Sequence, residues 1–148
     1  MRALAIIVVA LIAASSPFAQ TNGVDRTAEA RQYLAPCPSS TGVNSPGAWC
    51  EADQKQFLME YSQAYAGDYH AQRNVGFCFY SSCMNSVLTN RILACAWQKV
   101  LIANGSSDDS DTAALTIACG SLSKAEERAA AERAEAILAE INAARGIR

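Results

Sequence analysis

Cysteine is the residue type with the clearest chemistry in this sequence. The chain contains Cys37, Cys50, Cys78, Cys83, Cys95 and Cys119. Thiols either pair as disulfides or bind a soft metal ion, and a metal site needs closely spaced ligands, usually including histidines. The chain has a single histidine and no Cys-x-x-Cys spacing. We therefore expect three disulfides and no metal site.

The sequence alone does not select one pairing among those that six cysteines allow. The simplest pairing joins neighbours along the chain: Cys37 with Cys50, Cys78 with Cys83, and Cys95 with Cys119. The first bridge would close a loop containing proline and glycine, a constraint worth about 3 kcal/mol in the chain-entropy account. The third would clamp two helices across a turn.

Other residues with catalytic potential lack partners in the sequence. His70 lies early in an expected helix, and a general base also needs a nucleophile or water and an orienting group. The acids Glu51, Asp53 and Glu60 are ordinary scattered carboxylates rather than a glycosidase pair. We expect no catalytic residue and no bound cofactor.

Three aspartates, Asp108, Asp109 and Asp111, are spaced somewhat like the start of a calcium loop. The glycine that such a loop requires is missing, and the position of its final glutamate is taken by Cys119. Helix capping explains these aspartates better.

The N-terminus is typical of a secretory signal peptide. Arg2 is followed by an unbroken apolar run over residues 3–14 and then by small residues. This run of about a dozen residues is shorter than the roughly 20 that a spanning helix needs. We assign residues 1–19 to the signal, with cleavage between 15 and 20, and expect a secreted or periplasmic protein, exported by a bacterium, without a membrane anchor after cleavage.

The charge distribution argues against two classes of partner. The formal net charge is −2 and the basic residues form no block or stripe. Nucleic acids and anionic membranes select for clustered lysine and arginine. A protein or peptide is therefore the expected partner.

Helical patterns dominate after an irregular start. Residues 20–52 show no sustained period apart from a short helix near 27–34, and their prolines and glycines indicate an irregular extension carrying a disulfide loop. Asp53 and Gln56 form a capping-box pattern for a helix ending at Gly67. Later helices are expected from Asp68 to Tyr80, from Asn90 to Asn104, from Asp109 to Cys119, and from Ser123 towards the C-terminus.

Most aromatic side chains lie at helical spacing, which is typical of a core. This prediction covers Phe57, Tyr61, Tyr65, Phe77, Phe79, Tyr80 and Trp97. In the last helix Ala134, Ile137, Leu138 and Ile141 form one apolar stripe, so residues 122–148 are expected to dock as a capping helix rather than reach a partner.

A repeated pattern connects the central helices. The segment Ala71-Gln72-x-x-Val75-Gly76-x-x-x-Tyr80 resembles the first helix of Sel-one-like repeats, relatives of the tetratricopeptide repeats, although its tyrosine stands one residue late, with Phe79 in the usual position. Ala94-x-x-Trp97, followed by Gly105, is similar to the second helix. The small residues of this pattern permit close helix packing, and the terminal glycine turns the chain back.

The resemblance covers residues 53–121 as about one full repeat with partial units on each side. It departs from the family pattern where residues 81–86 replace a glycine-rich turn. It implies an all-α stack of antiparallel helix hairpins, here stapled by disulfides, and an exported, non-catalytic protein or peptide-binding scaffold of the cell envelope.

Two other functions remain open from the sequence. A small secreted inhibitor or effector-like protein would block an enzyme with the loop between Cys37 and Cys50, and would therefore need residues 20–52. A small hydrolase would need a pocket joining His70 to an acid and a hydroxyl.

Overall fold

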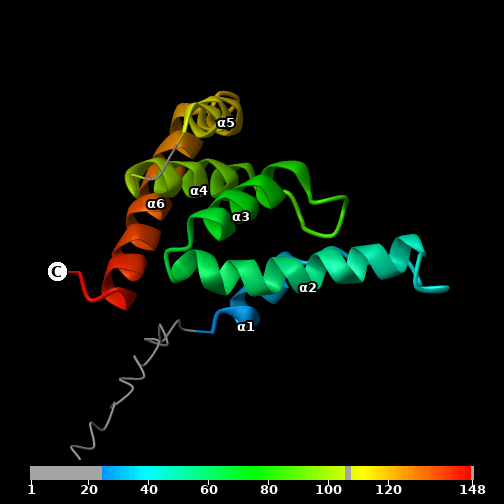
Figure 1. Ribbon diagram of the computed structural model, residues 1–148. Coiled ribbons are helices and arrows are strands. Elements are labelled where there is room, and N and C mark those ends of the chain that lie inside the picture. The colour runs from blue at the N-terminus through cyan, green and yellow to red at the C-terminus, as the bar shows by residue number, and fades with distance from the viewer. Residues whose placement is uncertain (1–24, 106–107, 148) are drawn as a thin grey trace, which may run out of the picture.

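The protein is a stack of helices (Figure 1), and three disulfides staple it. This computed structural model describes residues 25–105 and 108–147; the expected signal peptide and the Ser106-Ser107 turn lie outside them. The helices are α1 (Thr27–Ala30), the 3-10 helix η1 (Arg31–Tyr33), α2 (Pro46–Tyr65), α3 (Tyr69–Ser81), α4 (Arg91–Ala103), α5 (Asp109–Cys119) and α6 (Lys124–Ala144). The all-α prediction is confirmed. Of the helices described, none is long and apolar enough to cross a membrane.

Helix α2 starts earlier than the sequence pattern predicted. Its N-cap is Ser45, whose hydroxyl accepts a hydrogen bond from the Ala48 amide, and Pro46 occupies the first turn. Proline is favoured there because its missing N–H would have no helical partner. The prediction that Asp53 caps this helix was wrong, because Asp53 lies inside α2.

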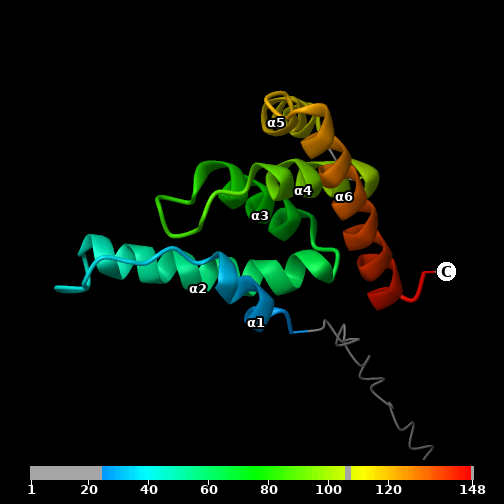
Figure 2. The same ribbon diagram turned by 180° about the vertical axis from the view of Figure 1, so that it is seen from behind.

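The predicted irregular extension, residues 20–52, is therefore partly helical in its described part, residues 25–52. Besides the start of α2 it contains α1 and η1, close to the short helix expected near 27–34. It also makes one isolated antiparallel bridge between Leu34 and Val87. The extension thus runs along the later helices rather than hanging free (Figure 2).

Side-chain caps begin the later helices where the sequence predicted. The Asp68 carboxylate accepts a hydrogen bond from the Ala71 amide at 2.8 Å, and Asn90 accepts one from the Leu93 amide at 3.0 Å. Asp108 and Ser123 each form a reciprocal capping box. Each such cap satisfies backbone donors that the first turn leaves unpaired.

Helices α2, α3 and α4 pack in succession, α5 packs on α4, and α6 crosses the ends of this layer against α4 and α2 (Figures 1 and 2). The face of α6 that docks contains Ala130, Ala134, Ile137 and Ile141, all buried. The C-terminal helix is therefore docked, as its apolar stripe indicated.

Aromatic rings fill the centre between these helices. Trp97, Tyr61, Phe57 and Phe79 are almost fully buried, and the Tyr65 and Trp97 rings meet edge to face with centroids 5.1 Å apart. The core prediction was wrong for two members of the aromatic set. Phe77 is 58 % exposed and Tyr80 is 41 % exposed.

The repeat-motif residues mostly lie where α3 meets α4. Ala71, Val75, Gly76, Ala94 and Trp97 are buried, and Gly105 ends α4 with a positive φ of 76°. Tyr80 is the exception, because Phe79 points into the core in its place. Each residue turns a helix by about 100°, so a shift of one position moves a side chain off the buried face.

All six cysteines are paired: Cys37 with Cys50, Cys78 with Cys83, and Cys95 with Cys119. This is the pairing between neighbours that the sequence favoured. The bridges join the extension to α2, the end of α3 to the turn after it, and α4 to α5. Three disulfides in so short a chain indicate an oxidising compartment.

Candidate functional site

The most developed concavity is a hollow of about 700 Å³ between α2, α3 and the turn that follows α3. Its lining consists of Asp53, Gln56, Phe57, Glu60, Asn74, Phe77, Cys78, Ser81, Ser82, Cys83, Met84 and Asn85. We call this feature the α2–α3 hollow. It falls in the size range of ligand sites in proteins.

Helical periodicity explains which side chains line the hollow. From α2 come Asp53, Gln56, Phe57 and Glu60, at spacings of three and four that place them on one face. From α3 come Asn74, Phe77, Cys78 and Ser81, at the same spacings. The two faces meet near the α2–α3 turn and diverge towards the end of α3 (Figure 1).

The end wall is a left-handed turn. Ser82, Cys83, Met84 and Asn85 have φ values of 66°, 41°, 55° and 69°. Residues other than glycine rarely adopt this region, and each one costs roughly 1 kcal/mol or more. The Cys78–Cys83 bridge closes this turn onto α3, and the Val87 amide donates to the Ser82 carbonyl at 3.0 Å.

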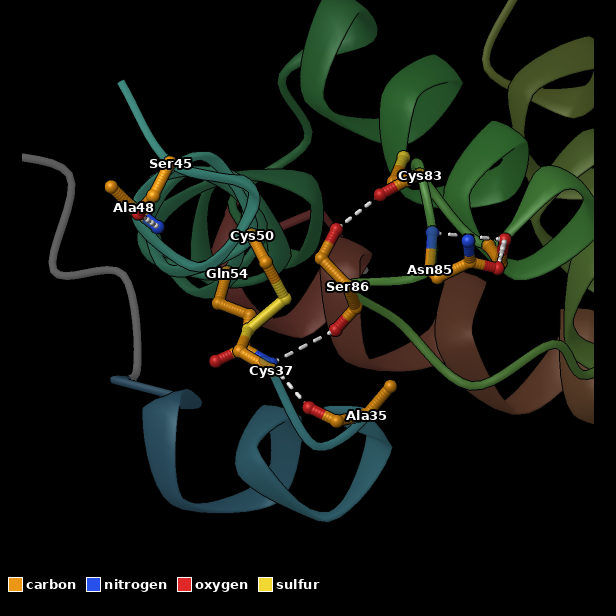
Figure 3. The surroundings of a disulfide bond; sticks show 10 residues. Ala35, Cys37, Ser45, Ala48, Cys50, Gln54, Cys83, Asn85 and Ser86 are labelled. Atoms are coloured by element: carbon orange, nitrogen blue, oxygen red, sulfur yellow. Dashed lines mark hydrogen bonds between the residues drawn. A yellow bond between two sulfur atoms is a disulfide. The ribbon is translucent and has the colours of Figure 1, made fainter. Parts of the chain in front are cut away.

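Contacts from α2 and from the N-terminal extension hold the segment that follows this turn (Figure 3). The Gln54 side-chain amide donates to the carbonyl oxygens of Ala35 and Ser86, the latter at 3.1 Å. The Ala35 amide donates to the same Ser86 carbonyl at 3.0 Å. The Cys37–Cys50 bridge lies one helical turn before Gln54 (Figure 3). The N-terminal extension therefore fixes the turn from outside the hollow.

Glu60 is the polar centre of the hollow. Glu60 is only 8 % exposed. Its Oε1 accepts hydrogen bonds from Gln56 Nε2 at 2.7 Å and from Asn74 Nδ2 at 2.8 Å. Both donors act on the same oxygen, and the described part of the chain supplies no hydrogen-bond donor to Oε2. The carboxylate is thus oriented from two helices with one oxygen left for a further donor.

The lining combines apolar side chains with acidic ones. The apolar surface comes mainly from Phe57, Phe77 and Met84, and the charged groups are the carboxylates Asp53 and Glu60. The single histidine, His70, is exposed on α3 and does not line the hollow; its ring packs on Tyr69. Among the described residues no group of three histidine, cysteine or acidic side chains is placed to hold a metal ion.

A partly buried polar network joins α1, α2 and α6 away from the hollow. Glu29 accepts hydrogen bonds from Tyr61 at 2.8 Å, from Arg26 at 2.8 Å and from Arg133 at 3.2 Å. Arg133 also donates to the Tyr65 hydroxyl at 2.9 Å. This network connects residues about 100 positions apart in the chain and is structural in character.

The pKa values of this network follow from its geometry. Burial pushes the pKa of Glu29 upward, but hydrogen bonds from Arg26 and Tyr61 outweigh it and hold the pKa below its ordinary value of 4.5. Burial, with the neighbouring Tyr65 and the Glu29 carboxylate, raises the pKa of Tyr61 well above its ordinary range. Both groups are therefore held in the states that the hydrogen bonds require.

A second acidic cluster has a capping role. Asp111 is fully buried and accepts hydrogen bonds from Tyr69 Oη at 2.6 Å and from the Asp108 amide at 3.0 Å. Arg73 Nε lies 3.2 Å from Asp111 Oδ1, as an ion pair without the alignment of a hydrogen bond. This cluster fixes α5 to α3, in line with the capping role that the sequence predicted.

A smaller, more open hollow of about 510 Å³ lies between α4 and α6. Its lining is Lys99, Lys124, Glu127, Arg128 and Ala131. It has no buried polar group and no aromatic side chain, so the α2–α3 hollow is the stronger candidate.

Sequence reasoning missed most of the α2–α3 hollow. It treated Glu60 and Asp53 as ordinary acids, and Phe77 as core. The detectable signal was the pair of matched stripes, Asp53–Phe57–Glu60 and Asn74–Phe77–Ser81, in which polar and apolar residues alternate at helical spacing. Of the repeat-motif residues on α3, Ala71, Val75 and Gly76 are buried and pack in the core rather than lining the hollow.

The fold and the hollow together define a small, disulfide-stapled all-α protein with an acidic and apolar concavity. Comparisons with protein-family models, with curated proteins and with solved structures found no match for this chain.

Proposed function

We propose that this chain is an exported, non-catalytic protein of the cell envelope that binds a short segment of another protein in the α2–α3 hollow. One observation carries the proposal: Phe77 and Met84, 58 % and 81 % exposed, line a concavity whose end wall is closed by the Cys78–Cys83 disulfide. Exposed apolar side chains grouped at a concavity are typical of a binding surface.

Export and family membership are part of the same proposal. The apolar run after Arg2 and the three disulfides support passage into an oxidising compartment. The close packing of Gly76 on Trp97, with a hypothetical Cβ only 3.3 Å from the Trp97 Cβ, supports a degenerate Sel-one-like helix pair formed by α3 and α4. Such helix pairs present surfaces for protein segments.

The test is selection of a display library of random peptides on the oxidised mature protein, with each selected clone then measured on variants. Phe77→Ser and Met84→Ser remove apolar surface from the rim of the hollow without adding charge, whereas Met59→Ser makes the same kind of change on an exposed part of α2 outside the hollow. We expect clones that lose binding at least about tenfold to both rim variants and keep it with Met59→Ser. A library without such clones would contradict the proposal.

The inhibitor alternative has one observation in its favour. Val43 is 89 % exposed in the loop closed by Cys37 and Cys50. In the same measurements Val43→Glu separates the two functions, because it alters the tip of this loop and leaves the hollow intact. Clones sensitive to Val43→Glu alone would favour the inhibitor.

A further inference from the structure

The lining of the α2–α3 hollow is asymmetric in charge. It includes Asp53 and Glu60 and no lysine, arginine or histidine. Glu60 is only 8 % exposed and its Oε1 accepts two hydrogen bonds from uncharged amides, whereas no described residue supplies a positive charge to this carboxylate. Its surroundings therefore favour a ligand that brings positive charge.

The hydrogen bonds of Glu60 indicate where a ligand's hydrogen-bond donor would bind. Gln56 of α2 and Asn74 of α3 both donate to Oε1, at 2.7 and 2.8 Å, and so orient the carboxylate from both helices. Oε2 receives no hydrogen bond from the described residues and belongs to a side chain that lines the hollow. A donor entering the hollow would meet this oxygen.

The apolar part of the lining further limits which cationic group would bind in the hollow. Phe57 is buried and lines the hollow, while Phe77 and Met84 are exposed beside it. Aromatic faces accept a guanidinium by stacking, and an arginine stem packs on apolar surface while its head forms hydrogen bonds. Arginine is less strongly hydrated than lysine and loses less on entering such a site.

We infer that the α2–α3 hollow recognises a peptide segment by one arginine side chain, whose guanidinium donates to Glu60 Oε2 while its stem and its apolar neighbours pack on Phe77 and Met84. This inference rests on the proposed function and specifies its ligand. Asp53, half-buried in the lining about two turns before Glu60 on α2, adds to the negative potential of the hollow.

The display selection described above tests the inference separately from the proposed function. Hollow-dependent clones should share an arginine beside apolar residues. If hollow-dependent clones are selected without a shared arginine, the inference fails and the proposed function stands. A shared lysine in its place would also overturn the assignment to arginine. If no hollow-dependent clone is obtained, both fail.

A selected arginine peptide then allows a coupling measurement. Replacing its arginine by citrulline, which keeps the shape and removes the charge, should weaken binding about tenfold or more to the wild-type protein. The same replacement should change binding little in Glu60→Gln, because the partner charge is gone. Glu51→Gln, exposed on α2 outside the hollow, is the matched control and should behave as wild type.

Two readouts protect this experiment from a folding artefact. A thermal melt shows whether Glu60→Gln is folded, and Asp53→Asn offers a second, less buried change that should weaken arginine binding more than citrulline binding. Equal binding of the arginine and citrulline peptides to the wild-type protein overturns the inference whatever the variants do.

Discussion

Tyr61 of α2 donates a hydrogen bond of 2.8 Å to Glu29 Oε1 of α1, and so ties the N-terminal extension to the centre of the helix stack. The same oxygen accepts a hydrogen bond from Arg133 of α6 at 3.2 Å. A single carboxylate thus holds together the first, second and last helices of the described chain.

The first prediction concerns this carboxylate. Glu29→Gln should lower the free energy of unfolding by about 1–2 kcal/mol, because hydrogen bonds to a charged group are stronger than those to an amide. Urea unfolding at neutral pH measures the change. Glu135→Gln, exposed on α6, removes the same charge without the network and should be nearly neutral.

The pH dependence of stability follows from the same group. Because the pKa of Glu29 is lowered in the folded state, the unfolded state takes up its proton first as pH falls below the ordinary value of 4.5. Stability from this group is therefore present above that value and is lost as pH falls through the folded pKa. Glu29→Gln should flatten the acid limb of the stability curve relative to wild type, and an unchanged limb would contradict this assignment.

The second prediction concerns the link between the extension and the turn after α3. Gln54→Ala removes the donor shared by the Ala35 and Ser86 carbonyls and should cost about 1–2 kcal/mol. Hydrogen exchange of the Leu88 amide, which donates to the Tyr33 carbonyl at 2.7 Å, should speed up more than exchange in α4. Gln63→Ala, exposed on the same helix, should leave that amide protected.

The third prediction concerns the contact between α3 and α4. A Cβ at Gly76 would lie 3.0 Å from Gln98 Nε2 and 3.3 Å from Trp97 Cβ. Gly76→Val should therefore destabilise the protein by about 1–3 kcal/mol through overpacking. Ala136→Val, exposed on α6, carries only the lower helix propensity of valine and should cost about 0.5 kcal/mol. Equal melting temperatures for the two variants would show that α3 and α4 lie further apart.

The parts of the fold that the sequence predicted are those set by local contacts. Helices α3 to α6 begin at capping side chains that hydrogen-bond within three residues, so their signals lie in the sequence itself. The start of α2 also has a local cap, Ser45 followed by Pro46, but the prolines and glycines around it favour an irregular chain and obscure that signal. Gly47 is needed where a Cβ would lie 2.4 Å from the Pro38 carbonyl oxygen, a contact formed only in the folded chain.

The site was less predictable than the fold for a similar reason. Its end wall has four successive residues in the left-handed region without one glycine, so no local preference indicates it. The disulfide between Cys78 and Cys83 and the contacts of Ser86 impose that conformation. Glu60 gains its significance only because Asn74 of the next helix faces it.

The fourth prediction concerns the bridge between α4 and α5. Helix α5 has only Asp111 and Ala118 buried, so the Cys95–Cys119 bond is a main attachment. The double variant Cys95→Ala, Cys119→Ala should lose about 3 kcal/mol of stability. Its exchange protection should fall first in α5. The pair Cys37→Ala, Cys50→Ala provides the control, because it should leave protection in α5 intact, and loss of α5 protection in both would refute a local effect.

The fifth prediction is that one substitution in the left-handed turn raises stability and weakens peptide binding. Met84 has a φ of 55° and is 81 % exposed. Its backbone strain is therefore not offset by burial of its side chain. Met84→Gly removes the clash of a Cβ in this region and should raise the free energy of unfolding by about 0.5–1 kcal/mol. The same substitution should weaken the binding of peptides that depend on the hollow, because it removes apolar surface from the rim.

Met59→Gly is the matched control for this change of sign. Met59 is also exposed, at 49 %, but it lies inside α2 and has no part in the hollow. Glycine there should lower stability by about 1 kcal/mol, since it is a poor helix former, and should leave peptide binding unchanged. If both glycine variants destabilise the protein equally, residue 84 does not adopt the left-handed region in solution. If Met84→Gly is more stable and binds peptides as wild type does, Met84 makes no contribution to binding. The peptide-binding surface then lies closer to Phe77.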